Sequence, residues 1–164
     1  MVLPMDSPSY PPESPSHTPF MAHLGPHHAS AHDGQSRLEL KLQPWQRNGL
    51  GVAHGGVIMT LLDAAMAMAA KSADPAGAWV VTIEMKTSFL RPGRDELIAL
   101  GFCEHRSTSM AFCRGEIKDP SGRLIATAMG TFRRMTALAG RKAPTGDLPT
   151  HDGFGRPQGA YDRR

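Results

Sequence analysis

The chain of 164 residues has little cysteine and few aromatic residues. Its two cysteines, Cys103 and Cys113, are too few for a disulfide-rich scaffold or an all-cysteine zinc site, and their spacing does not match a zinc finger. The fold must therefore be stabilised by a hydrophobic core. The length allows one ordinary domain.

The chain has neither a large excess of positive over negative residues nor an apolar stretch long enough to span a membrane. Lys and Arg number 18 against 15 Asp and Glu, an excess too small for a nucleic-acid-binding surface, so no nucleic-acid partner is expected. The longest apolar stretch, residues 57–70, contains Asp63 and is shorter than the roughly 20 residues that cross a bilayer. The first twenty residues lack the pattern of an export signal. We therefore expect a cytoplasmic protein with no membrane partner.

Composition divides the chain into three segments. Residues 1–36 hold seven prolines, six serines and five of the eight histidines without apolar periodicity, which predicts a flexible arm outside the core. Residues 137–164 are rich in Gly, Pro and charge, which predicts an irregular tail. The folded domain is then residues 37–136. Removal of residues 1–36 is expected to leave it folded and active.

The histidines of the arm raise the question of a metal site. They are His17, His23, His27, His28 and His32. Their spacing matches no known ligand pattern and neither cysteine is near, so the sequence favours no metal and no cofactor.

The domain begins with a short predicted strand at residues 37–42, followed by a loop and a long helix. The helix, Gly55 to Lys71, is rich in Ala, Met and Leu and apolar on nearly every face, which predicts burial on all sides. Alternating residues predict four further strands, at 79–90, 96–106, 110–118 and 123–135. In the first of these, Trp79, Val81 and Ile83 should face the core. Short connections between these four strands predict an antiparallel meander, and the fold class is α+β.

The two cysteines fix the register of one hairpin. A turn at residues 107–109 places Cys103 opposite Cys113. We expect two reduced thiols packed as small apolar groups, with a disulfide or a catalytic role as alternatives.

Asp63 is the strongest chemical signal, because it interrupts an otherwise apolar helix. Burying a carboxylate costs several kcal/mol unless it is bonded or neutralised, so it is a candidate general base or nucleophile. The alternative is an aspartate on a solvent-facing strip or bonded to nearby backbone.

A second signal, NGLGVAHGG at residues 48–56, precedes the helix. Free N–H groups at the helix start, next to Gly55 and Gly56, can stabilise negative charge on an oxygen, and Asn48 and His54 add polar side chains. The alternative is a glycine-rich turn with a capping histidine. His54 and Asp63 are nine residues apart, hence about 180° round the helix and about 13 Å along it. If both act in one reaction, they come from different subunits, which implies a dimer with composite sites.

These motifs, with VTIEMKTSFLRPG at 81–93 and GRLIATAMGTF at 122–132, resemble the hotdog-fold acyl-CoA thioesterases of the phenylacetyl-CoA type. The resemblance covers about residues 37–135 and implies a helix wrapped by an antiparallel sheet. It implies that Asp63 activates water or attacks a thioester carbonyl, that the Gly55 N–H polarises this carbonyl, and that Asn48 and His54 position the acyl end. Thr82 matches the position of a hydroxyl residue that holds the water.

The resemblance also implies an acyl-CoA substrate and a homodimer, with a dimer of dimers, a homotetramer, as the expected assembly. Arg91, Arg133 and Arg134, together with Gly56, are candidates for substrate binding, although surface solvation explains any one arginine equally well. The expected reaction is hydrolysis of an aryl- or medium-chain acyl-CoA. A non-catalytic acyl-CoA sensor and a hotdog hydratase or dehydratase are the alternatives, and release of thiol would separate them.

Overall fold

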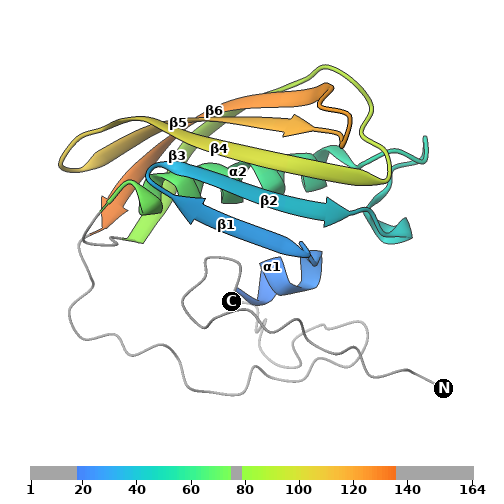
Figure 1. Ribbon diagram of the computed structural model, residues 1–164, viewed down its shortest axis with the longest axis horizontal. Coiled ribbons are helices and arrows are strands. Elements are labelled where there is room, and N and C mark those ends of the chain that lie inside the picture. The colour runs from blue at the N-terminus through green and yellow to red at the C-terminus, as the bar shows by residue number, and fades with distance from the viewer. Residues whose placement is uncertain (1–17, 75–78, 136–164) are drawn as a thin grey trace, which may run out of the picture.

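The computed structural model describes residues 18–74 and 79–135, and these form a helix packed on an antiparallel sheet (Figure 1). The strands are β1 (His28–His32), β2 (Gln35–Lys41), β3 (Trp79–Phe89), β4 (Glu96–Arg106), β5 (Met110–Lys118) and β6 (Leu124–Met135). Their order in the sheet is β1-β2-β4-β5-β6-β3. The helices are α1 (Pro19–Leu24), the short 3-10 helix η2 (Pro44–Gln46) and α2 (Gly55–Ser72). The expected α+β architecture is confirmed.

Helix α2 packs unusually close to the middle of the sheet because two glycines lie beneath it. Gly101 of β4 pairs with Gly115 of β5. A Cβ atom at Gly101 would lie 2.3 Å from the carbonyl oxygen of Ala65, which excludes any side chain there. The Ser36 hydroxyl donates to the same carbonyl at 2.6 Å. Glycine is thus required for the close approach of helix and sheet.

The hairpin of β4 and β5 has the predicted bounds and the predicted register, with Cys103 opposite Cys113. Both cysteines are free thiols. Burial and the neighbouring Cys103 raise the pKa of the Cys113 thiol. Because only the thiolate is a strong nucleophile, this pair is better suited to packing than to catalysis.

The predicted meander is wrong at one step: β3 pairs with β6 and not with β4. The connection at residues 90–95 crosses the end of the sheet, and the N–H groups of Leu90 and Arg91 donate to the carbonyl of Ile125. Six extended residues reach about 20 Å, more than the roughly 15 Å that separates strands three places apart. A short connection therefore does not require its strands to be neighbours.

The predicted boundary at residue 36 also needs correction, because residues 18–36 pack on the domain. Thr18 caps α1 by accepting from the N–H of Met21 at 3.3 Å, and Gly25 ends it in the left-handed region. Met21 and Leu24 are buried in the core, while β1 pairs with β2. A six-residue helix is too short to show apolar periodicity. Residues 1–17 of the predicted arm, and the predicted tail at 137–164, lie outside the described residues.

Two further expectations about burial are wrong for the single chain. A register shift between Thr82 and Glu84 bends β3, and Trp79, Val81 and Ile83 are exposed. Helix α2 is not covered on every side, since Asp63 is only half-buried. The sheet covers one face of α2 and leaves a strip open. Within the described residues, no helix is long and apolar enough to cross a membrane.

Candidate functional site

His54 begins the site as the N-cap of α2. The imidazole Nδ1 of His54 accepts a hydrogen bond from the N–H of Gly56 at 3.0 Å. The backbone N–H of His54 donates to the carbonyl of Gln46 at 2.8 Å. In a neutral imidazole whose Nδ1 accepts, Nε2 carries the proton. The capping role considered from the sequence is confirmed. The Gly56 N–H is consequently already engaged inside the chain.

The adjacent N–H of Gly55 is different. No described residue accepts a hydrogen bond from it. A Cβ atom at Gly55 would make only ordinary contact with the Phe89 ring, at 3.6 Å, so packing within the chain does not require glycine here. This N–H lies at the positive end of the α2 dipole. It is a donor available to an oxygen atom of a ligand.

Asn48 lies in the loop ahead of α2 and shares a hollow with Gly55. Its side-chain oxygen accepts from the N–H of Leu50 at 2.9 Å, which leaves its amide N–H groups free to donate. Asn48, Gly55, Phe89 and Arg91 line a cavity of about 400 Å³. The structure thus brings together three residues that the sequence singled out: Asn48, Gly55 and Arg91.

Asp63 lies in the third turn of α2 and is joined to Thr82 of β3. The Thr82 hydroxyl donates to Oδ1 of Asp63 at 2.7 Å. Thr82 faces the helix because it pairs with the buried Phe132 of β6. No described residue donates to Oδ2 of Asp63. The hydrogen bond from Thr82 therefore orients Oδ1 of Asp63, and Oδ2 remains available to accept a hydrogen bond from a ligand.

Some predicted site residues are not brought together within one chain. Asp63 lies eight residues beyond Gly55, which corresponds to about 12 Å along the helix. Arg133 is exposed and lies opposite Val81 in the pairing of β6 with β3. It is therefore near the other end of β3 from Arg91.

Arg134 has a structural role that the sequence did not show. Its guanidinium donates to the carbonyls of Ser107 and Thr108, at 2.9 and 2.7 Å, and pairs with the buried Asp74. These bonds hold the turn between β4 and β5 against β6. Arg134 is therefore poorly available to a substrate.

The sequence missed a second hollow, which lies beside His54. Phe20 and His23 of α1, Trp45 of η2 and Val57 of α2 line a groove of about 430 Å³ together with His54. The rings of His23 and Trp45 lie 5.1 Å apart. A signal for α1 was present: Thr18-Pro19 and Gly25 form the expected start and stop of a short helix.

Comparisons with known proteins agree with this architecture. Residues 50–126 match the sequence profile described as "Thioesterase superfamily". A Halobacterium salinarum protein named "Putative esterase" is 39% identical over 85 residues, 49% of this chain and 56% of that protein. The chain covers 56% and 66% of the lengths of the two curated relatives, thus less than two thirds of each.

Solved structures extend the similarity over more of the chain. A conserved Pseudomonas aeruginosa protein is 25% identical with a TM-score of 0.71, covering 76% of this chain and 100% of its own. A Ralstonia eutropha protein described as a "putative thioesterase, phenylacetic acid degradation-related protein" is 27% identical with a TM-score of 0.63, covering 71% and 90%. Together with the long helix α2 against a six-stranded antiparallel sheet, these findings show that the chain has the hotdog fold.

Proposed function

We propose that the protein hydrolyses the thioester of an aryl- or medium-chain acyl-CoA to the free acid and CoA. The observation that carries the proposal is the Asp63 carboxylate, held by Thr82 on the open strip of a helix whose first N–H is free. The similarity to the thioesterase superfamily and to esterases supports thioester hydrolysis in general. The CoA ester and the residue roles are our inference.

In the proposed reaction, the Gly55 N–H donates to the thioester carbonyl oxygen and stabilises the negative charge that develops on it. Asp63 either takes a proton from water as the water attacks the carbonyl carbon, or attacks that carbon directly. The carbon–sulfur bond then breaks and the CoA sulfur takes a proton. In the second route, water hydrolyses the resulting anhydride. Thr82 orients Asp63 and binds the water.

The proposed active unit is a homodimer with composite sites. Gly55 and Asp63 of one chain lie about 12 Å apart along a single helix, so one chain cannot place both on one carbonyl. The exposed Val81 and Ile83 of β3, a strand that pairs with β6 alone among the described strands, offer a surface for a second copy. Two such dimers would form the homotetramer, for which exposed Phe112 and Met129 provide apolar area.

Substrate positions follow from the two hollows on either side of the helix start. Arg91 lies in the cavity that contains Gly55 and is suited to a CoA phosphate, with Arg133 of the partner chain as a second candidate. Asn48 and His54 position the acyl end. The aromatic groove beside His54 extends the space available to the acyl group.

The test is thiol release from a panel of acyl-CoAs by the full-length protein. Asp63→Asn keeps the shape of the side chain but cannot accept the proton or attack, so turnover should fall by at least about a hundredfold while ligand binding persists. Asp33→Asn makes the same change at an exposed residue and should leave turnover unchanged. No thiol release from any ester would contradict hydrolysis and favour a sensor or a hydratase. Full activity of Asp63→Asn would contradict the mechanism.

The composite site has a separate test by subunit mixing. Chains carrying Asn48→Ala, mixed under exchange with chains carrying Asp63→Asn, should recover about a quarter of wild-type activity. Half the dimers are mixed, and each then has one intact site of two. No recovery after proven exchange would contradict sites shared between chains.

A further inference from the structure

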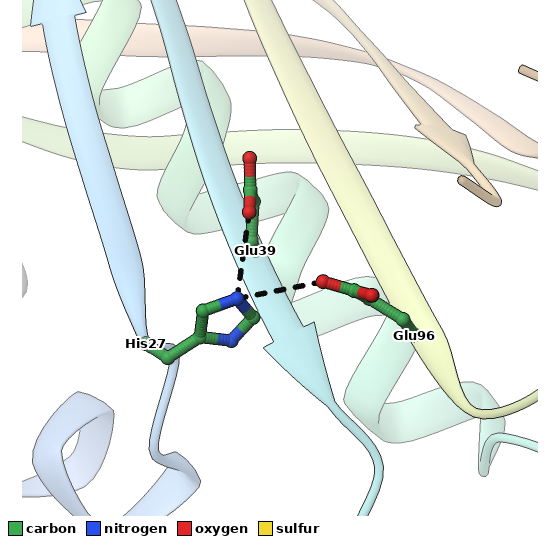
Figure 2. Close-up of side chains that lie close together, drawn as sticks. All are labelled: His27, Glu39 and Glu96. Atoms are coloured by element: carbon green, nitrogen blue, oxygen red, sulfur yellow. Dashed lines mark ion pairs between the residues drawn. The ribbon is translucent and has the colours of Figure 1, made fainter.

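Three metal-ligating side chains from separate segments converge away from the Asp63–Thr82 pair. His27 precedes β1, Glu39 lies on β2, and Glu96 begins β4 (Figure 2). Nε2 of His27 lies 3.4 Å from a carboxylate oxygen of Glu39 and 3.4 Å from one of Glu96. All three ligand atoms lie within 4.8 Å of one another.

At 3.4 Å, His27 forms only loose ion pairs with Glu39 and Glu96, and the space between the three groups can hold an ion. A charge-assisted hydrogen bond from imidazolium to carboxylate measures about 2.7–2.9 Å. Zinc binds histidine nitrogen and carboxylate oxygen at about 2.1 Å in tetrahedral geometry, which places two ligand atoms about 3.4 Å apart. The separations from His27 to Glu39 and Glu96 match that edge length.

The surrounding structure holds the ligands in these positions. The N–H of His27 donates to the backbone carbonyl of Glu39 at 2.9 Å, and β2 and β4 pair with Lys41 opposite Glu96. The Arg37 side chain donates to Oε1 of Glu39 at 2.6 Å, while Oε2 faces His27. Such outer contacts orient metal ligands and strengthen binding. The two carboxylates provide negative charge for a cation, although the cationic side chains of Arg37 and Lys41 lie beside them.

We propose that His27, Glu39 and Glu96 bind one zinc-type divalent cation, with a fourth position for water. The cation fastens the segment that follows α1 to β2 and β4, and so holds α1 against the domain. The ligands lie 12 and 57 residues apart in sequence, and they come together only because the strands of the sheet pair. The proposal is independent of the thioesterase reaction.

The experiment uses the full-length chain, freed of metal with EDTA and dialysed, then titrated calorimetrically with zinc chloride. We expect one saturable site per chain and a rise in Tm of about 10 °C at hundredfold excess over Kd. His27→Gln and Glu96→Gln should each weaken binding by about a hundredfold or more. His32→Gln is the matched control, because His32 also lies beside a carboxylate, that of Asp33, but in an exposed pair.

The comparison of variants decides the proposal. Loss of the site in both His27→Gln and Glu96→Gln, with His32→Gln unchanged, supports it. Absence of saturable binding, retention in either ligand variant, or equal loss in His32→Gln overturns it. If the ligand variants do not fold, cobalt bound to the wild-type chain gives the answer: the intense visible absorption of tetrahedral cobalt supports the site, and a weak octahedral spectrum overturns it.

Discussion

The two edges of the sheet are built differently. Strand β1 has five residues, mostly polar and including two histidines, and its neighbour α1 adds Met21 and Leu24 to the core. Strand β3 has eleven residues and exposes large apolar side chains. Short polar edges resist pairing with other chains, whereas long apolar edges promote it. The β1 edge is therefore completed by its own chain, and the β3 edge is suited to a second chain.

The largest expected effect comes from removing the β1 edge. Deletion of residues 1–36 removes α1 and β1, and the buried Met21 and Leu24 with them. Burial of two such side chains contributes about 3–6 kcal/mol, comparable to the stability of a small domain. This replaces the sequence-based expectation that the deletion is tolerated. Urea unfolding should show a lost or strongly reduced transition.

Deletion of residues 1–17 alone is the control for this experiment. It leaves α1 intact, together with the Thr18 cap. Its urea midpoint should equal that of the full chain. A stable chain after deletion of residues 1–36 would mean that the β1 edge contributes little.

The next largest effect comes from a pair of substitutions, one expected to change the stability of the chain and the other its self-association. Ile117 of β5 is fully buried, so Ile117→Ala should lower the free energy of unfolding by about 2–5 kcal/mol. Ile83 of β3 is 56% exposed, so Ile83→Thr should change the stability of the chain by only about 0.5 kcal/mol. It should instead weaken self-association by at least about tenfold in sedimentation equilibrium. An unchanged association constant would argue against β3 as the contact surface.

The smallest expected effect on stability comes from the turn between β5 and β6, which contains Asp119. This turn leads into β6, the strand that pairs with β3. Hydrogen bonds, first from Ser121 and then from Arg123, hold the pKa of Asp119 below its usual range. A lowered pKa in the folded chain stabilises it above the unfolded pKa of about 3.9, and this contribution is lost as pH falls through the folded value. Asp119→Asn should therefore lower the urea midpoint slightly at pH 7. The gap from wild type should shrink toward pH 3, and a gap independent of pH would contradict this origin.

Part of the candidate site could be predicted from local patterns alone. Asp63 stood out because it interrupts an apolar helix, and His54-Gly55-Gly56 because glycines follow a polar residue at a helix start. The family resemblance pointed to the Gly55 N–H, but local patterns alone do not show which N–H stays free, since this depends on the His54 side chain that accepts from the Gly56 N–H. Arg134 looked equivalent to Arg91 in sequence, and only tertiary contacts separate them: Arg134 is bound to Asp74 and to the turn between β4 and β5, whereas Arg91 lines the cavity that contains Gly55.

The helix that begins at Gly55 and the strands β4 and β5 could be predicted from local patterns, because periodicity is a property of neighbouring residues along one element. Three contacts depend on the packing of the whole domain: β3 pairs with β6, Thr82 donates to Asp63, and His27 lies close to Glu39 and Glu96. These contacts join residues far apart in the chain. They depend on how the whole sheet packs around α2, and no local pattern records that packing.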